Sequence, residues 1–184
     1  MTQLDQLAEE LVTTGRTLRR AANDGAIRVH REGPRRLTVS PGEIVYVRRH
    51  WPLLSSLRRA LRTEPNVRFG LLYGSTARGD DDPESDVDVL VALADEHLTR
   101  AAGLAERLSA ACGREVRLLR LSDAERNPVL LAAAAQDGRV LIDRDGMSGA
   151  LRARREPLRR AAERSLRARR RRALNAVDAL TQSR

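Results

Sequence analysis

The most constraining feature of this 184-residue chain is an apolar run that ends at Gly74 and Ser75 and is followed, after ten further residues, by Asp86 and Asp88. The run before Gly74 and the run that contains the two aspartates are short and apolar, which predicts two buried strands. Glycine permits close backbone approach, and a helix that begins here would direct its amides at an anion. The pattern therefore predicts two strands joined through an anion-binding turn.

The two aspartates indicate what else this turn binds. Residues two positions apart in a strand point to the same face, so the carboxylates of Asp86 and Asp88 should lie side by side. Neighbouring carboxylates repel each other unless a cation lies between them, and Mg²⁺ commonly takes one or two carboxylates together with phosphate oxygens and water. A clamp for Mg²⁺ and a nucleoside triphosphate is thus favoured over an unliganded, half-exposed strand. The other acidic residues of the connecting segment are expected to be solvated loop charges: Asp80, Asp81, Asp82 and Glu84.

Strands and helices alternate from residue 66 to residue 146, which predicts a mixed sheet flanked by helices. The expected strands are 67–73, 86–93, 115–121 and 139–142. The expected helical segments are a turn at 75–78 and helices at 98–111 and 128–136. A separate connecting helix is expected before this region, within residues 51–65.

This region resembles the minimal nucleotidyltransferases of the DNA polymerase beta superfamily, whose motif is Gly-Ser, ten residues and Asp-x-Asp. The resemblance implies an α+β fold in which a mixed sheet carries the site. It also implies attack of a hydroxyl on the α-phosphorus of a nucleoside triphosphate, with Mg²⁺ and with ATP as the expected nucleotide. The implied nucleotide-binding residues are Gly74, Ser75, Arg78 and Ser85, and the implied metal-binding and catalytic residues are Asp86 and Asp88.

A third carboxylate, which the family usually supplies from a later strand, is replaced here by Arg117. In two-metal phosphoryl transfer this carboxylate helps hold the metal that activates the nucleophile, so a cation there reverses the local electrostatics. Glu115 lies two positions earlier, on the same strand face, and is the candidate for the missing catalytic oxygen. The alternative is that Glu115 is a strand-edge charge paired with an arginine.

Residues 1–50 are expected to form a module of two helices, at 4–12 and 16–22, two short strands at 26–30 and 37–39, and a further short helix. The module resembles an excisionase-like or MerR-like winged helix-turn-helix, which implies that the second helix enters the major groove of duplex DNA. The alternative is a small helical interaction module. A homodimer is expected, because nine arginines against six acidic residues leave little excess charge for one copy. The implied DNA-binding residues are Arg16, Arg19 and Arg20, with Arg31, Arg35 and Arg36 in the wing.

The net charge of +9 belongs to one segment, because residues 152–172 hold eleven arginines against Glu156 and Glu163. We expect a basic C-terminal helix within 150–184. Its charge is either a solvated face or a contact with nucleic acid or an acidic protein. Its apolar stripe is either core or a partner surface. The stripe consists of Leu158, Ala162, Leu166, Ala173, Val177 and Leu180.

Several classes of protein are disfavoured by composition. One cysteine and three scattered histidines provide neither an internal disulfide nor a His/Cys zinc site. The sequence lacks an apolar stretch near the roughly 20 residues that cross a bilayer, so a cytoplasmic protein without a membrane contact is expected. Aromatic residues make up only 2% of the chain, which argues against a reader of single strands or RNA.

Together these features predict a Mg²⁺-dependent nucleotidyltransferase that transfers AMP from ATP to a protein acceptor and is fused to a DNA-binding module. Family likeness suggests an antitoxin whose partner is a HEPN-type toxin and whose DNA target is its own operator. The first alternative, supported by Arg117, is a DNA-binding regulator whose nucleotidyltransferase domain is catalytically inactive. The second is transfer to a small molecule such as an aminoglycoside, which usually requires an additional acceptor-binding domain.

Overall fold

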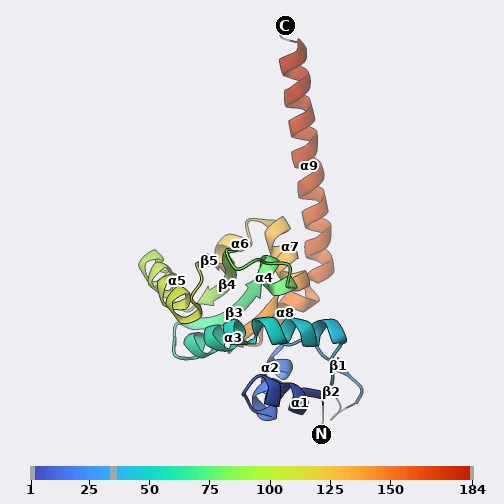
Figure 1. Cartoon of the computed structure of the whole chain (residues 1–184). Coiled ribbons are helices and arrows are strands. Elements are labelled where there is room, and N and C mark those ends of the chain that lie inside the picture. The colour runs from blue at the N-terminus through green and yellow to red at the C-terminus, as the bar shows by residue number, and fades with distance from the viewer. Residues whose placement is uncertain (1–2, 34–36, 183–184) are drawn as a thin grey trace.

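The computed structural model describes residues 3–33 and 37–182, with side chains as far as Asn175. A body built around a four-stranded sheet carries a long C-terminal helix that projects away from it (Figure 1). The N-terminal part comprises α1 (Gln3–Glu10), α2 (Gly15–Asp24) and a two-stranded hairpin of β1 (His30–Arg31) and β2 (Leu37–Thr38). Helix α3 (Pro41–Arg62) leads from this part into the sheet.

The sheet has the strand order β5-β4-β3-β6. Its strands are β3 (Val67–Tyr73), β4 (Val87–Leu93), β5 (Val116–Arg120) and β6 (Arg139–Asp143). Strand β3 is antiparallel to β4 and β6, whereas β4 and β5 are parallel. Because β3 and β4 run in opposite directions, Tyr73 at the end of β3 pairs with Asp88 near the start of β4. The topology therefore places the turn after β3 directly beside the two aspartates.

Helices cover both faces of the sheet. The remaining helices are α4 (Gly74–Arg78), α5 (Leu98–Cys112), α6 (Leu121–Ala124), α7 (Pro128–Asp137), α8 (Met147–Ala153) and α9 (Arg155–Gln182). Alternate residues of β4 divide between two hydrophobic clusters: Val87 and Val89 pack with α3 and α5, and Leu90 packs with α7 and the start of α9. Since Asp86 and Asp88 alternate with Val87 and Val89, they lie on the same face as Leu90.

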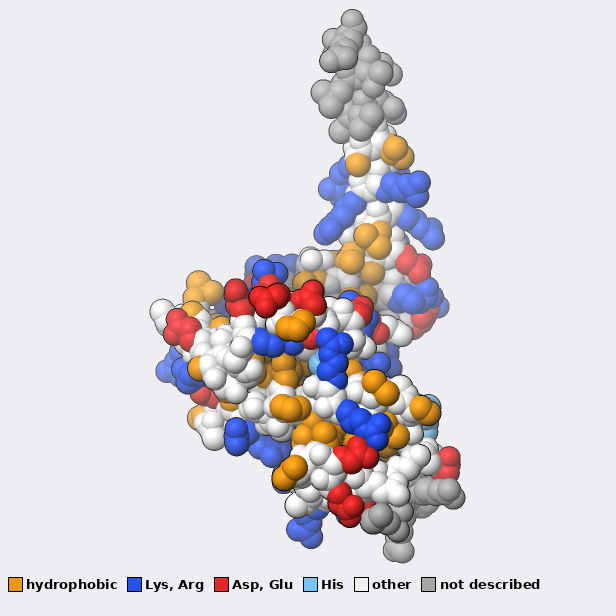
Figure 2. Space-filling view, in the orientation of Figure 1, with side chains coloured by type: hydrophobic (Ala, Val, Ile, Leu, Met, Phe, Trp, Pro, Cys, Tyr) orange, Lys and Arg blue, Asp and Glu red, His pale blue; other side chains and the backbone are white. Residues whose placement is uncertain are grey.

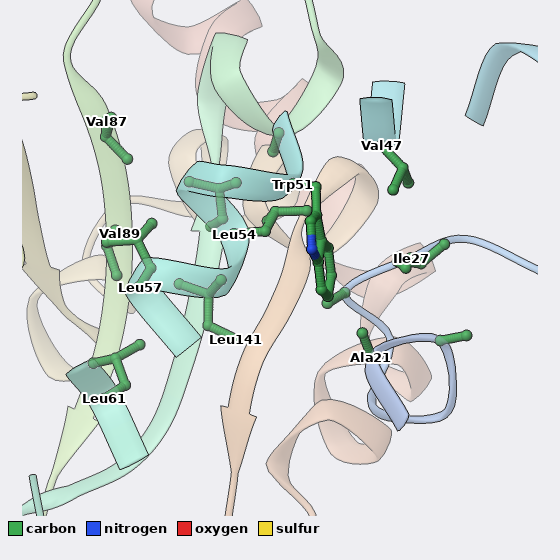
Figure 3. Packing of buried hydrophobic residues seen from close by; sticks show 14 of the residues in the cluster. Ala21, Ile27, Val47, Trp51, Leu54, Leu57, Leu61, Val87, Val89 and Leu141 are labelled. Atoms are coloured by element: carbon green, nitrogen blue, oxygen red, sulfur yellow. The ribbon is translucent and has the colours of Figure 1, made fainter. Parts of the chain in front are cut away.

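The N-terminal part shares its hydrophobic core with the sheet. Ala21 and Ile27 belong to the same buried cluster as Trp51 and Leu57 of α3 and Val89 of β4, as Figure 3 shows. Apolar burial of this kind is the main favourable term in folding. Hydrophobic packing is therefore continuous across residue 50, where the sequence suggests a module boundary.

Three expectations about local structure were wrong, and they concern the helices around residue 50, the segment 26–30 and the C-terminal segment. The helices expected on either side of residue 50 are one helix, α3, because burial of Trp51, Leu54 and Leu57 outweighs the hydrogen bond that Pro52 cannot make. The segment 26–30 is not a strand before His30, since the amides of Ala26 and Ile27 bond to the carbonyl of Ala21 and close the end of α2.

The C-terminal segment, expected to form one helix, consists of two: α8 ends and α9 begins around Arg154. The four strands expected in the sheet are confirmed with small changes at their ends: Asp86 and Glu115 each lie one residue before a strand, and residue 121 begins α6. None of the helices in 3–33 and 37–182 is both long enough and apolar enough to cross a membrane.

Candidate active site

The site is centred on Gly74, where β3 passes into α4. Gly74 has a φ of +75°, and a Cβ atom at this position would lie 2.4 Å from Oδ2 of Asp88. Only glycine adopts this left-handed conformation readily and leaves room for the carboxylate. The missing side chain thus lets the backbone of the turn lie directly against Asp88.

The environment of Asp88 is unfavourable for an isolated negative charge. Burial raises the pKa of Asp88, Arg117 opposes this rise, and the neighbouring charge of Asp86 adds to it. Burial, together with the charge of Asp88, also raises the pKa of Tyr73 to about 12, so that its phenol stays neutral. A cation bound between the two aspartates would relieve their repulsion.

Arg117 supplies a positive charge beside the two aspartates. It is the residue of β5 that pairs with Asp88 of β4, and its Nη2 lies 2.5 Å from Oδ2 of Asp86. The Arg117 side chain is 67% exposed, whereas that of Asp86 is 24% exposed. Arg117 is therefore an exposed counterion for Asp86.

Glu115 is at the same end of the sheet but makes no ion pair in the described structure. It lies one residue before β5, its carbonyl accepts a hydrogen bond from the amide of Val87, and its side chain is exposed. In the part of the chain that the structure describes, no three His, Cys, Asp or Glu side chains gather closely enough to hold a metal together. The role of Glu115 as a third catalytic carboxylate stays a prediction.

The other expected nucleotide-binding residues differ in how firmly they are held. The hydroxyl of Ser75 makes no hydrogen bond with the described residues, and the carbonyl of Ser75 accepts a hydrogen bond from the amide of Gly79. Arg78 is exposed and pairs with Asp80 at 3.1 Å. The hydroxyl of Ser85 instead donates to Asp82 at 2.9 Å and shapes the connecting loop. Ser75 therefore retains a free hydroxyl at the site.

The expectation that Asp81 is a solvated loop charge was wrong. Its side chain is 2% exposed, with His50 Nε2 at 2.8 Å from Oδ1 and Arg114 Nη1 at 2.8 Å from Oδ2. Burial acts to raise the pKa of Asp81, but the hydrogen bonds and charges of His50 and Arg114 outweigh it, so the pKa lies below its usual value. Arg114 also donates to the carbonyl of Ser85, so this cluster fixes the loop that leads to Asp86.

A second buried cluster fixes the other side of the turn. Arg139 is 1% exposed and forms two hydrogen bonds to Glu43 of α3. Its Nε donates to the carbonyl of Ala77 in α4 at 2.7 Å, and its guanidinium lies 3.4 Å from the ring centroid of Tyr46. The hydroxyl of Tyr46 donates to the carbonyl of Thr76. Helix α4 is thus held by side chains from α3 and β6.

The arginines expected to contact DNA are dispersed. Arg16 and Arg20 are exposed on α2 and line a cavity of about 180 Å³ beside Trp51 and Arg58 of α3. Arg19 pairs with Asp5 at 2.6 Å. Arg31 donates to the side chain of Asn23. Arg35 and Arg36 lie outside the described residues.

The residues present at the turn fit Mg²⁺ with a triphosphate. Asp86 and Asp88 supply two adjacent carboxylates, Gly74 leaves open backbone beside them, and Ser75 has a free hydroxyl. These are the donor types that Mg²⁺ and phosphate oxygens require. The arrangement is suited to holding a charged nucleotide against the end of the sheet.

Comparisons with known proteins agree with this geometry. The sequence profile described as Polymerase beta, Nucleotidyltransferase matches residues 55–146, which is half of the 184 residues. A solved toxin-antitoxin structure with AMP-PNP contains a chain of similar fold, with a TM-score of 0.52 and 23% identity over 67% of this chain and 97% of that chain. A mutant of the toxin-antitoxin MntA-HpeT gives a TM-score of 0.52 and 21% identity, also over 67% of this chain and 97% of that one. The sequence matches none of the curated proteins.

Sequence reasoning missed the residues that support the turn. Asp81 and Arg114 are 33 positions apart, and Glu43 and Arg139 are 96 positions apart. The spacing of Tyr46 and His50, one helical turn apart on α3, was the one available signal. Partners at such separations are brought together only by folding.

Proposed function

Because the chain belongs to the polymerase beta nucleotidyltransferase family, we propose that it binds ATP with Mg²⁺ and transfers AMP to a hydroxyl group of a protein. The observation that carries this proposal is the contact between Gly74 and Asp88, beside Asp86. Magnesium held by the two carboxylates would neutralise negative charge on the triphosphate. Ser75 and the neighbouring amides would bind phosphate oxygens, and Arg78 would add a charge-assisted contact.

The reaction forms a bond between the acceptor oxygen and the α-phosphorus and breaks the bond from that phosphorus to pyrophosphate. The acceptor proton must leave as the new bond forms, and Glu115 is the candidate base. Its carboxylate is exposed at the start of β5, at the same end of the sheet as Asp86. Clusters around Asp81 and Arg139 hold the two segments that carry the nucleotide contacts, which limits their movement during transfer.

The proposed acceptor is a HEPN-type toxin, for which this chain would be the antitoxin. Support comes from the sequence motif and from the fold shared with chains of solved toxin-antitoxin structures, one of them with AMP-PNP. The shared fold spans 97% of the length of those chains. A protein acceptor is also compatible with an open site, since Arg117 above it is largely exposed.

The test is calorimetric titration of the full chain with ATP in the presence and absence of Mg²⁺. The double variant Asp86→Asn with Asp88→Asn should lose Mg²⁺-dependent binding and keep its melting temperature. A matched control, Asp145→Asn with Glu125→Gln, removes the same charge at two exposed ion pairs elsewhere and should bind as the wild type does. Unchanged ATP affinity in the site variant would contradict the clamp.

Transfer itself is measured with ATP labelled at the α-phosphate and with a purified HEPN-type toxin as acceptor. Label should pass to the toxin and disappear with the site variant. If Mg²⁺·ATP binds but no label is transferred, the chain is a nucleotide-binding regulator without turnover. The pairing of Arg117 with Asp86 is the observation that favours this second candidate.

Operator binding by a homodimer through α2 is a further part of the proposal, supported by the exposed arginines of that helix. Arg19→Ala and Arg20→Ala should each weaken binding by about 1–3 kcal/mol if a bidentate contact to guanine is lost. Binding to DNA from upstream of the gene, measured by fluorescence anisotropy, tests this, and sedimentation tests the dimer. Full binding by the double variant would exclude α2 as the reading helix.

A further inference from the structure

A basic cleft of about 550 Å³ lies between the N-terminal part and the C-terminal helices. One wall is the segment from the end of α2 to β1, and the other is formed by the end of α7 with the α8 and α9 region. Four arginines line it: Arg28, Arg31, Arg152 and Arg155. They come from both ends of the chain, so folding alone creates this concentration of charge.

Arg28 interacts with the charges of Glu43 and Asp137, whereas Arg31, Arg152 and Arg155 make no ion pair with the described residues. Arg28 donates to the carbonyl of Asp137 at 2.6 Å, and Arg155 donates to the carbonyl of Ala135 at 2.7 Å. Both acceptors are uncharged oxygens. The side chain of Arg152 has no hydrogen bond or ion pair in the described part of the chain, and Asp137 is the one acidic residue in the lining. The cleft therefore carries an excess of guanidinium charge.

We propose that this cleft binds phosphate groups of a duplex nucleic acid. A guanidinium presents several donors in a planar fork that matches two phosphate oxygens, and each of these arginines uses only part of its donors. A concave surface with several such forks holds a phosphate more firmly than arginines scattered on a convex one, because several donors converge on the same group.

The projecting helix extends the same charge. Beyond Glu163, the arginines of α9 make no ion pair with the described residues, and they lie on opposite sides of the helix (Figure 2). They are Arg164, Arg167, Arg169, Arg170, Arg171 and Arg172. A long anionic polymer contacts both the cleft and the helix, whereas a free phosphate fills only the cleft.

Duplex is favoured over single-stranded nucleic acid by the positions of the aromatic residues. Binding of single strands commonly uses exposed rings on which bases stack. Here Tyr46, Trp51 and Phe69 are buried, which leaves Tyr73, half-buried at the end of β3, as the remaining ring. Contacts to the backbone of a duplex need charge but no rings.

This cleft is distinct from the α2 surface expected to read DNA, and Arg31 is the one lining arginine that also belongs to the expected wing. On α2, Arg19 is already paired with Asp5, and Arg16 and Arg20 flank a different, smaller cavity. The inference is also independent of AMP transfer, because neither Mg²⁺ nor ATP takes part in it.

The experiment measures binding of the full-length protein to a short mixed-sequence DNA duplex by fluorescence anisotropy at several salt concentrations. The variant Arg152→Gln with Arg155→Gln, whose residues belong neither to α2 nor to the expected wing, should bind severalfold more weakly. The slope of log affinity against log salt should fall in magnitude by about 2, since each lost phosphate contact removes about one unit. Arg152→Lys, which keeps the charge and loses the fork, should show a smaller loss.

The matched control is Arg100→Gln with Arg107→Gln, which removes the same charge from α5. It should bind as the wild type does, and the melting temperatures of all variants should agree. Equal affinity and slope in the cleft variant and the control would overturn the proposal. Competition by polyglutamate as effective as that by DNA, charge for charge, would also overturn it and indicate an acidic protein as the partner.

Discussion

Two arginine–carboxylate pairs in this protein have opposite environments. Arg139 and Glu43 are 1% and 6% exposed, and a pair of hydrogen bonds joins them. Arg117 and Asp86 are 67% and 24% exposed and meet through one close contact at the candidate metal site. Water competes for the second pair and is excluded from the first.

The buried pair is structural, whereas the exposed pair is exchangeable. Removal of one partner from a buried pair leaves a charge without water or counterion, so the fold depends on both. An exposed pair loses little when it opens, because water solvates each group. Arg139 therefore fixes α4, whereas the exposed Arg117 can separate from Asp86 at little cost.

The largest effect is expected at the buried pair. Glu43→Ala should lower the free energy of unfolding by about 3–5 kcal/mol, because Arg139 stays buried without its counterion. Urea denaturation followed by circular dichroism measures this. The double variant Glu43→Met with Arg139→Met leaves no buried charge and should recover part of the loss. Equal destabilisation by the single and the double variant would refute the explanation.

A smaller effect is expected at Asp81, whose side chain is buried although the residue lies in the loop between α4 and β4. Asp81→Asn should cost about 1.5–3 kcal/mol through the loss of charge-assisted hydrogen bonds. Because the pKa of Asp81 is lowered in the folded state, its stabilisation is complete above about pH 4, the pKa of an unfolded aspartate. It is lost as the pH falls below that value toward the pKa of the folded state.

Denaturation at a series of pH values checks this sign. Between about pH 5 and about pH 3 the wild type should lose more stability than Asp81→Asn. Asp80→Asn is a matched control, since Asp80 is exposed on the same loop, and its pH dependence should follow that of the wild type. A variant that loses as much stability as the wild type on acidification would rule out this role for Asp81.

At the exposed pair we expect a change in function with little change in stability. Arg117→Gln should alter the free energy of unfolding by at most about 1 kcal/mol. Arg117→Asp should increase Mg²⁺-dependent ATP binding and AMP transfer, because it adds a carboxylate where a cation stood.

Glu115→Gln should abolish transfer if Glu115 is the base. Transfer that is insensitive to Glu115→Gln would remove that residue from the mechanism.

The smallest effect is expected on the projecting part of α9. Leu166 is 51% exposed, so Leu166→Ser should leave the melting temperature unchanged within error. Leu158, two turns earlier on the same helix, is 7% exposed and packs with α7, so Leu158→Ser should clearly lower the melting temperature. A marked loss of stability with Leu166→Ser would show that the outer part of α9 also covers apolar surface. Val177 and Leu180, the end of the expected stripe, lie outside the described side chains.

The sequence predicted the central strands and the turn at Gly74 because their signals are local. Val67–Tyr73 is a mostly apolar run with one charged residue, Arg68, and the glycine that follows it is required by its own φ angle. Helix α3 was predicted as two pieces because Pro52 is also a local signal, and burial of the flanking apolar residues overrode it. Local patterns failed wherever packing supplied the larger free energy.

Local patterns in the sequence predict the two-carboxylate motif, the shared face of Asp86 and Asp88, and the concentration of arginines near the C-terminus. The fold is what buries Asp81 with Arg114, places Arg139 against α4, and brings Arg28 and Arg152 into the lining of one cleft. The physical reason is that periodicity and turn chemistry act over a few residues, whereas a buried charge depends on which distant segment provides its counterion.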